Sequence, residues 1–397
     1  MSGDAARPLL RLKPRADRRL KSGHPWAFSN EIAPSPALSA VPAGGLVRLE
    51  ADDGTRFGTF YFNPHSLIAA RLLDRDPDAV IDGAWFAARL GAARALRARL
   101  GLGPAHRLIH AEADGLPGLV IDRFDDVAVV QANTAGMERL LPELLAGLAA
   151  TLPLRAVVAR NDSPVRTLEA LPRETRLLIG EDMPASVTEG GVRFPLDLLG
   201  GQKTGWYFDQ RPHRDMIARL APGARVLDLF CHTGGFGLRA AHAGAAEVLL
   251  IDQSAPALAL AAQAAAENGF SPRITTRQGE VFAALAALGE AGQRYDIVIA
   301  DPPAFAPTRK DQAAGLRAYA RLARLACGLV APGGFLFIAS CSHHAPAAEF
   351  TSAVANGLHR ARREGRILAS GGAGPDHPVH PALPESAYLK TALLQIS

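Results

Sequence analysis

Several residues of this chain have the types found in catalytic and binding sites, and they lie where strand-like segments end. Residues 301–305 read Asp-Pro-Pro-Ala-Phe and directly follow an apolar segment. Two prolines fix an extended, rigid backbone, so this loop can hold the Asp301 carboxylate against a flat polar ring. Phe305 can stack on the ring, as aromatic side chains do on unpaired nucleobases. The pattern predicts three substrate contacts, Pro302, Pro303 and Phe305; a Pro-rich turn is the alternative.

A cysteine ends the next strand-like segment. Cys341 lies in Ser-Cys-Ser at 340–342, and neighbouring parallel strands end at one sheet edge, so we expect it near Asp301. A thiolate there is a candidate nucleophile if its pKa is lowered. The alternative, a small buried side chain, fits Cys231 and Cys327 better. The adjacent histidines at 343 and 344 match no zinc spacing, so the sequence predicts no metal site.

Acidic residues follow the three strand-like segments before that loop. Asp228 precedes a glycine turn whose spacing is not G-x-G-x-x-G. Its carboxylate disfavours a pyrophosphate and suits an ammonium group, such as that of a methionine moiety. Asp252 ends the next segment, where an acid commonly takes the ribose hydroxyls of an adenosine. Gly279 and Glu280 follow the third and could meet an adenine.

The segment Gln202–Arg211 mixes aromatic and ionic side chains ahead of the glycine turn. It could cover an adenosine and a carboxylate, with Thr204, Tyr207 and Arg211 as candidate contacts. A guanidinium can pair a carboxylate through two hydrogen bonds. A surface linker is the alternative.

These residues need a sheet to bring them together. From about residue 191 to 397, strand-like segments alternate with Ala-rich helical ones. The expected strands cover 225–230, 248–252, 273–277, 297–301, 335–341 and two segments at the C-terminus, and the expected helices cover 255–268, 316–329 and segments starting at 235 and 346. This alternation predicts an α/β domain with a doubly wound, Rossmann-like parallel sheet that binds ligands beyond the strands' carboxyl ends.

Two smaller domains are expected before it. Residues 1–75 carry short β-like segments at 9–12, 45–50, 56–62 and 67–72, which suggests a small β-barrel. Residues 76–190 suggest an α+β domain with helices at 84–100 and 137–150 and strands at 119–124, 127–131, 156–160 and 177–179. A hairpin around Gly190-Gly191 is expected to connect it to the last domain.

Composition limits the class of protein. The 397 residues are 48% hydrophobic and 21% charged, with 3 Cys and a net charge of +4. These values exclude a disordered chain, a collagen-like chain and a disulfide scaffold. Sparse cysteines, no signal peptide and no membrane span favour the cytoplasm. A basic cluster that runs from Arg7 to Lys21 suits a phosphate backbone, although a solvated surface is the alternative. Its candidate contacts are Arg15, Arg18, Arg19 and Lys21.

Taken together, the sequence resembles the class I S-adenosylmethionine-dependent methyltransferases of large-subunit ribosomal RNA that carry an N-terminal PUA domain. Nearly the whole chain takes part in the resemblance. The segments that carry it are 12–14, 23–26, 112–119, 202–211, 228–236, 301–303 and 340–342. The segments 112–119 and 202–211 are the most specific to this family.

The resemblance implies an enzyme that forms 5-methylcytosine in ribosomal RNA with S-adenosylmethionine. Asp228, Phe230 and Gly234 would hold the methionine part, Asp252 the ribose, and Gly279 and Glu280 the adenine; the family usually has Asp at position 280. Asp301 would hold the cytosine edge and Cys341 would attack C6. The N-terminal domain would read RNA. A homodimer is compatible with such domains, and nothing in the sequence requires one.

Other functions remain open at this point. An enzyme that methylates a guanine or adenine nitrogen could use the Asp-Pro-Pro motif without a nucleophile, because nitrogen has its own lone pair. A non-catalytic RNA-binding assembly factor could keep the fold as a scaffold. A dehydrogenase that uses NAD is disfavoured, since the phosphate-binding glycine spacing is absent.

Overall fold

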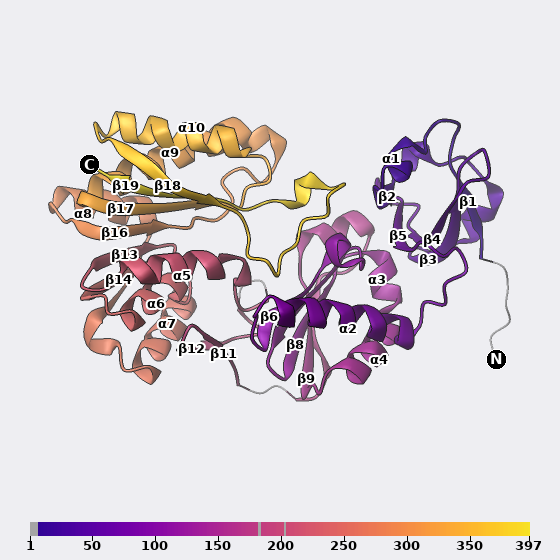
Figure 1. Cartoon of the computed structure of the whole chain (residues 1–397), viewed down its shortest axis with the longest axis horizontal. Helices are drawn as coiled ribbons and strands as arrows, with labels where there is room; N and C mark the ends of the chain where they lie inside the picture. The colour runs from indigo at the N-terminus through magenta and orange to yellow at the C-terminus, as the bar shows by residue number, and fades with distance from the viewer. Residues whose placement is uncertain (1–6, 182–183, 202–203) are drawn as a thin grey trace. The chain divides into compact units, whose positions relative to one another are not determined.

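The computed structural model describes residues 7–181, 184–201 and 204–397, and the chain forms two compact units. The first unit contains residues 1–185, 197–206 and 375–384. The second contains 186–196, 207–374 and 385–397. The chain therefore passes from one unit to the other after residues 185, 196, 206, 374 and 384 (Figure 1). Each unit is completed by segments that lie far apart in the sequence.

The N-terminal part of the first unit is a small β domain, as predicted. Its five-stranded sheet has the order β1-β3-β4-β5-β2. The strands are β1 (Leu9–Arg11), β2 (Trp26–Ala27), β3 (Gly45–Glu50), β4 (Arg56–Phe62) and β5 (Ala70–Asp74), with one short helix, α1 (Arg18–Lys21). Alternate residues of β3 are buried, which gives the sheet one core face. The predicted strand at 67–72 begins three residues later, because Asn63-Pro64 and the residues after them form the preceding turn.

The rest of the first unit is an α+β fold around a second five-stranded sheet of order β10-β9-β8-β7-β6. Its elements are α2 (Gly83–Arg99), β6 (Ala105–His110), β7 (Leu119–Phe124), β8 (Val127–Ala132), α3 (Ala135–Arg139), α4 (Leu141–Thr151), β9 (Ala156–Asn161) and β10 (Glu174–Ile179). The helix predicted over 137–150 is two helices. Pro142 lies in the first turn of α4, where its missing N–H costs nothing, and the chain breaks just before it at Leu140.

The second unit begins with the predicted hairpin of β11 (Ala185–Glu189) and β12 (Val192–Leu196), turned at Gly190 and Gly191, which both have positive φ. A seven-stranded sheet of order β15-β14-β13-β16-β17-β19-β18 follows. Its strands are β13 (Arg225–Leu229), β14 (Glu247–Asp252), β15 (Ile274–Gln278), β16 (Tyr295–Ala300), β17 (Val330–Ser340), β18 (Gly365–Gly371) and β19 (Lys390–Ile396). The first five run parallel, whereas β19 is antiparallel to both of its neighbours. The doubly wound prediction is confirmed, with a mixed rather than purely parallel sheet.

Helices cover both faces of this sheet. They are α5 (Arg211–Leu220), α6 (Gly235–His242), α7 (Ala255–Glu267), α8 (Val281–Glu290), α9 (Gln312–Leu329) and α10 (Ala347–Arg360). Leu227 and Leu229 of the central strand share a core with α8, α9 and α10. On the opposite face Phe337 packs against Phe236 of α6, with ring centroids 5.2 Å apart. Period-two alternation thus sends successive strand residues into different cores.

Candidate active site

The parallel strands of the second unit end at one edge, and the predicted site residues follow them. Asp228 lies within β13, one residue before its end, while Asp252 ends β14 and Asp301 directly follows β16. Leu229 is paired with Ile251 on one side and with Ala300 on the other. The register therefore places Phe230, the residue after Leu229, between Asp252 and Asp301.

The glycine turn after β13 folds back because three of its residues adopt positive φ. These are Phe230 at 58°, His232 at 50° and Gly234 at 79°. A Cβ on Gly237 would lie 2.3 Å from the Leu250 side chain, so α6 can approach the sheet this closely only with glycine there. The turn brings the first N–H groups of α6 to the strand ends, where such groups bind polar ligands.

Asp228 is buried, with 1% of its surface exposed. Its Oδ2 accepts a hydrogen bond from the Gly237 N–H at 2.9 Å. Burial first, opposed by the hydrogen bond from the Gly237 N–H and aided by the negative charges of Asp301 and Asp252, raises the Asp228 pKa to about 8. At neutral pH this carboxyl is therefore mostly protonated, and a positively charged ligand group would ionise it.

Asp252 and the end of β15 form the next part of the edge. The two Asp252 oxygens accept hydrogen bonds from the His232 N–H at 2.9 Å and the Ser254 N–H at 2.8 Å. Each carboxylate oxygen has a second lone pair, which leaves acceptor capacity for hydroxyl groups. The Gly279 N–H donates to the Asp252 carbonyl at 3.0 Å, and a Cβ on Gly279 would meet no atom within 4 Å.

Glu280 has a role that the sequence analysis did not identify. Its carboxylate accepts hydrogen bonds from the N–H groups of Phe282 and Ala283, at 3.0 and 2.8 Å. These are orphan donors in the first turn of α8, so Glu280 is the N-cap of that helix. The expected contact between Glu280 and an adenine stays a prediction.

This edge has the chemistry that an adenosine joined to a methionine requires. Asp228 is a buried acid that could pair with an ammonium group, and Asp252 is a carboxylate with spare acceptor capacity. Phe230 offers an aromatic surface between the two acidic strand ends, and Gly279 leaves open space beside Asp252. The residues present therefore fit S-adenosylmethionine.

The segment 202–211 divides between the two units. Gln202 and Lys203 lie outside the described residues. Thr204 belongs to the first unit, where its hydroxyl donates to Asp122 Oδ2 at 2.5 Å. This hydroxyl therefore has a protein partner, and the expected contact between Thr204 and the cofactor stays a prediction.

Tyr207 and Arg211 belong to the second unit. The Tyr207 ring meets the His232 ring edge-on at 5.3 Å, and burial, followed by the negative charge of Asp301, raises the Tyr207 pKa. Tyr207 therefore lies at the acidic strand ends, as its prediction requires. The carboxylate observed at Arg211 is that of Glu189, 3.3 Å from Nε, and Arg214 binds the same carboxylate through two hydrogen bonds of 2.5 and 2.8 Å.

Cys341 lies beside the Asp-Pro-Pro loop. Its Sγ donates to the Pro302 carbonyl oxygen at 4.0 Å, and the side chain is partly exposed. The other two cysteines are buried. Burial raises the pKa of Cys327 to about 11 and that of Cys231 well above its usual range. Cys341 is therefore the cysteine whose exposure suits a nucleophile.

The serines on either side of Cys341 anchor it. Ser340 Oγ donates to the Tyr319 hydroxyl at 2.9 Å, and that hydroxyl shares a 2.8 Å hydrogen bond with Ser342 Oγ. Ser342 Oγ also accepts from the Ala306 N–H at 3.0 Å, which ties the strand end to the Asp-Pro-Pro loop. The contacts of Tyr319 could not be predicted, because nothing in the sequence of helix α9 marks it as a partner of these serines.

Phe305, the last residue of the loop 301–305, packs against other aromatic side chains. Its ring lies 4.9 Å from Tyr319, 6.1 Å from Phe282 and 6.4 Å from Phe230. These three aromatic neighbours fix the orientation of the Phe305 ring, so the ring is already in place for a base to stack on it. Pro302 is buried and Pro303 is exposed.

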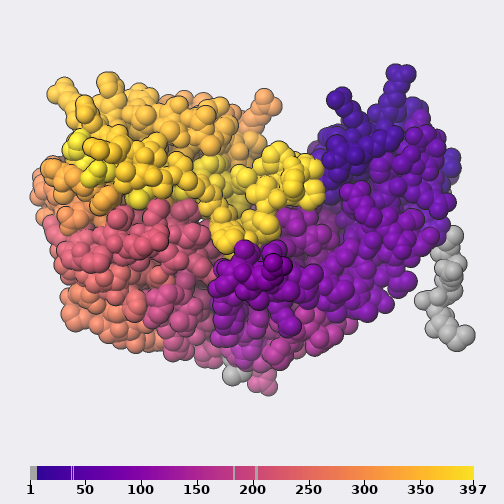
Figure 2. All heavy atoms as spheres, viewed as in Figure 1, coloured from indigo at the N-terminus to yellow at the C-terminus, as the bar shows by residue number. Residues whose placement is uncertain are grey.

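The basic cluster of the first unit is only partly available to phosphates. Arg7, the first residue of the predicted cluster, is used within the first unit. Its guanidinium donates to Thr59 Oγ1 and to the carbonyls of Pro77 and Ala79. The four candidate residues Arg15, Arg18, Arg19 and Lys21 are exposed, and long side chains project from the surface around α1 (Figure 2, indigo). Arg19 pairs with Glu31 at 2.6 Å and Lys21 with Asp17.

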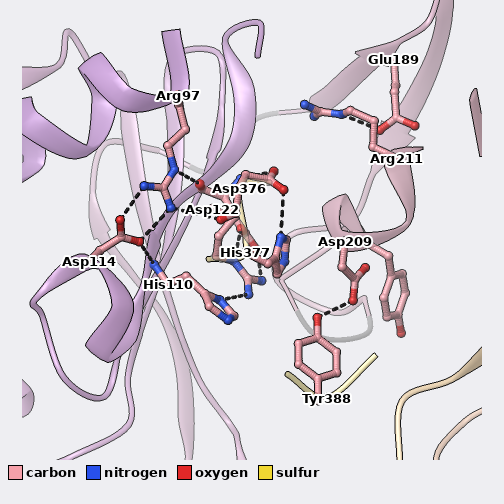
Figure 3. A network of polar contacts seen from close by, with 12 residues as sticks. Arg97, His110, Asp114, Asp122, Glu189, Asp209, Arg211, Asp376, His377 and Tyr388 are labelled. Atoms are coloured by element: carbon pink, nitrogen blue, oxygen red, sulfur yellow. Dashed lines mark hydrogen bonds and ion pairs between the residues drawn. The ribbon is translucent and has the colours of Figure 1, made fainter. Parts of the chain in front are cut away.

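The first unit also contains a buried polar network around Arg97 (Figure 3). Its guanidinium binds both carboxylate oxygens of Asp114, at 2.5 and 2.7 Å, and the Asp376 carbonyl at 3.0 Å. Arg97 has no exposed surface. Asp114 belongs to the segment 112–119, one of the two segments most specific to the family. Its role in the structure is to bind the buried Arg97 guanidinium.

Within the described residues, we find no helix with both the length and the apolar character needed to cross a membrane.

Comparison with known proteins identifies the family. Residues 10–75 match the PUA-like domain family, and residues 158–364 match the S-adenosylmethionine-dependent methyltransferase family. The chain is 37% identical over 394 residues to a "Ribosomal RNA large subunit methyltransferase I" of Shewanella denitrificans, covering 98% of this chain and 99% of the relative. It is 36% identical over 409 residues to a "Ribosomal RNA large subunit methyltransferase" of Deinococcus radiodurans, covering 100% and 99%.

Solved structures support the same fold. A SAM-dependent methyltransferase from Streptococcus mutans matches with a TM-score of 0.80 at 19% identity, covering 98% of this chain and all of that chain. A methyltransferase named SMU.776, solved in complex with S-adenosylhomocysteine, matches with a TM-score of 0.82 at 20% identity over the same shares. The chain therefore belongs to the S-adenosylmethionine-dependent methyltransferases that carry an N-terminal PUA-like domain, the family of these ribosomal RNA large subunit methyltransferases.

Proposed function

We propose that this protein methylates C5 of a cytosine in large-subunit ribosomal RNA and that Cys341 forms a covalent adduct with the base. The observation that carries the proposal is the position of Cys341: a partly exposed thiol whose Sγ lies 4.0 Å from the Pro302 carbonyl, next to Asp301. A nitrogen methyltransferase has no use for a nucleophile at this position.

Ribosomal RNA is proposed as the substrate because the full-length relatives carry that activity in their names. The exposed basic residues around α1 support contact with phosphates. We propose that residues 1–75 read the RNA, that 76–190 link this domain to the next, and that 191–397 perform the chemistry. The sparse cysteines, 3 in the chain, support a location in the cytoplasm.

The strand ends of the second unit would hold the cofactor. Asp228 would bind the amino group of its methionine part, Asp252 the ribose hydroxyls, and the backbone at Gly279 the adenine. When bound, S-adenosylmethionine supplies the methyl group that C5 receives. Tyr207 would close over these acids, since its ring already lies against the glycine turn.

The reaction requires covalent help because C5 of cytosine is a weak nucleophile. The Cys341 thiolate forms a bond to C6, and the electron pair of the C5–C6 double bond shifts through the ring to N3, which takes a proton from water; the Asp301 carboxylate accepts a hydrogen bond from the new N3–H and offsets the charge on the ring. C5 is then nucleophilic enough to accept a methyl group. Loss of the C5 proton to a base, return of the N3 proton to water and cleavage of the C6–S bond restore the aromatic ring and the thiolate.

The test is nucleoside mass analysis of large-subunit ribosomal RNA after incubation with the protein and isotopically labelled S-adenosylmethionine. We expect label in 5-methylcytidine with the wild-type protein and with Cys327→Ala, which removes a buried thiol elsewhere. Cys341→Ala should lose turnover. Label in a guanosine or adenosine product that survives Cys341→Ala would contradict the proposal and favour the nitrogen-methylating reading.

A second experiment isolates the covalent step. RNA containing 5-fluorocytidine has no C5 proton to lose, so an adduct formed with Cys341 should persist through methyl transfer. We expect a denaturation-resistant protein–RNA complex with wild-type protein and none with Cys341→Ala. A complex that forms equally well in both would show that the attached residue is not Cys341.

A further inference from the structure

Lys390 is the first residue of β19, and the sheet places it opposite the residue before Cys341. The antiparallel pairing of β17 and β19 puts Lys390 directly across from Ser340. No motif marks this lysine in the sequence, and only the strand register brings it to the nucleophile's end of the sheet.

The Lys390 ammonium is held in place by two carbonyl groups. Its Nζ donates to the Ser342 carbonyl at 2.5 Å and to the Tyr388 carbonyl at 2.8 Å. Carbonyls accept hydrogen bonds only, so the nitrogen donates in both contacts, and an ammonium can make both with one N–H to spare. A protonated Lys390 therefore places a positive charge on the turn that carries Cys341.

The ionisable groups near the Ser-Cys-Ser turn include neutral and acidic side chains. Tyr207 and Tyr319 are electrostatically coupled to Cys341, and burial raises the pKa of both, so they stay neutral. Asp301, on the adjoining loop, and Asp209 both act on Tyr207 as negative charges. His343, beside Lys390, has its pKa lowered by burial first and then by that lysine, so it too is neutral at pH 7.

We propose that Lys390 is the positioning residue for Cys341: its ammonium fixes the Ser-Cys-Ser turn and offsets the surrounding negative charge, so that the thiol ionises near neutral pH. Two independent observations support this, the strand register and the pair of hydrogen bonds. The electrostatic coupling agrees in sign, because burial lowers the pKa of Lys390 while Cys341 raises it. The role in catalysis depends on the proposed function; the ionisation of Cys341 does not.

The test measures the rate of Cys341 alkylation by iodoacetamide from pH 6 to 10, read from the Cys341 peptide by mass spectrometry. An opposite charge within several ångströms commonly shifts a pKa by one unit or more, and the thiolate is the reacting form. Lys390→Met should therefore move the midpoint up by about one pH unit and, for a wild-type midpoint near pH 7, slow alkylation at pH 7 by about fivefold. Lys390→Arg, which keeps the charge, should stay near wild type.

Two further variants keep the experiment decisive. Lys390→Gln retains hydrogen-bond donors without the charge, so it should shift the midpoint as Lys390→Met does even if the latter folds poorly, which a melting curve would show. Lys310→Met removes an exposed lysine of the same unit and should change nothing. An unshifted midpoint in folded Lys390→Gln, or a shift in Lys390→Arg equal to that in Lys390→Gln, would overturn the proposal.

The outcome is separable from the proposed function. If alkylation depends on Lys390 while labelled RNA contains only a nitrogen-methylated product, the link between Lys390 and Cys341 stands and the cytosine reaction fails. If 5-methylcytidine forms but alkylation is indifferent to Lys390, the cytosine reaction stands and the role of Lys390 fails.

Discussion

Proton release on cofactor binding should reveal the state of Asp228. Burial raises its pKa to about 8, so about 0.9 of these carboxyls are protonated at pH 7. An ammonium group seated against Asp228 would favour the carboxylate and expel that proton. Binding of S-adenosylhomocysteine at pH 7 should therefore release about 0.9 proton from the protein, and its Kd should fall nearly tenfold between pH 6 and pH 7.

Calorimetric titration in buffers of different ionisation enthalpy measures this proton directly. Asp228→Asn should release none and should bind more weakly. Asp296→Asn is the matched control. Asp296 lies near the start of β16, at the other end of that strand from Asp301, and its carboxylate accepts a hydrogen bond from the Arg225 N–H. A wild-type protein that binds with no proton release at pH 7 would refute the argument, since Asp228 would then be ionised before the ligand arrives.

The same pKa has a consequence for stability without ligand. The folded protein keeps the Asp228 proton up to about pH 8, whereas the unfolded chain loses it near 3.8. The free energy of unfolding should thus fall as pH rises through that window, by up to about 1.4 kcal/mol per pH unit from this group. Asp228→Asn should remove this contribution, which denaturant melts at pH 5 and pH 8 would detect.

Three other predictions concern the framework around the sites. Arg97→Met leaves the buried Asp114 carboxylate without its guanidinium and should cost about 3–5 kcal/mol in urea unfolding. Gly136→Ala should destabilise by about 1–3 kcal/mol in the same assay, because the new Cβ would lie 2.2 Å from the Tyr61 ring. Glu280→Ala should cost about 1 kcal/mol by loss of the α8 N-cap, measured by thermal melting.

Each of these has a control on a similar element. Arg99→Met removes an exposed arginine from the same helix as Arg97 and should be near neutral. Gly91→Ala should be neutral or stabilising, because a Cβ there meets no atom within 4 Å. Glu290→Ala, at the other end of α8, should leave stability unchanged or improve it. A control as costly as its partner would contradict the explanation given for that partner.

The strands of the second unit and four of its described α-helices could be predicted because their signals are local. The edge of the sheet could be predicted from the apolar runs, the glycine turn and the residues after each strand. Asp252 ends its strand, and Asp301 and Cys341 directly follow theirs, as expected. Helix α8 was not predicted, although Glu280 was noticed; its capping role is set by its distance from two N–H groups, which no spacing reveals.

Some residues have protein partners far away in the sequence, which the sequence did not predict. Arg7 looked like a phosphate contact, and its hydrogen bonds go to Thr59 and the carbonyls near residue 78. Thr204 looked like a cofactor contact, and its hydroxyl binds Asp122, 82 residues earlier. Strand β6 was missed because His106, Arg107 and His110 interrupt its apolar pattern. In each case a polar group is satisfied by tertiary structure that a single sequence does not display.

The return of residues 375–384 to the first unit bears on how the protein is made. Arg97 depends on the Asp376 carbonyl, 279 positions later in the chain. A ribosome synthesises from the N-terminus, and early domains commonly fold before later ones exist. Here Arg97 can bind Asp114 early, but its hydrogen bond to the Asp376 carbonyl has to wait until residue 376 has been synthesised. The first unit therefore completes its packing late, and a product truncated before residue 375 should lack that contact and be open to proteolysis.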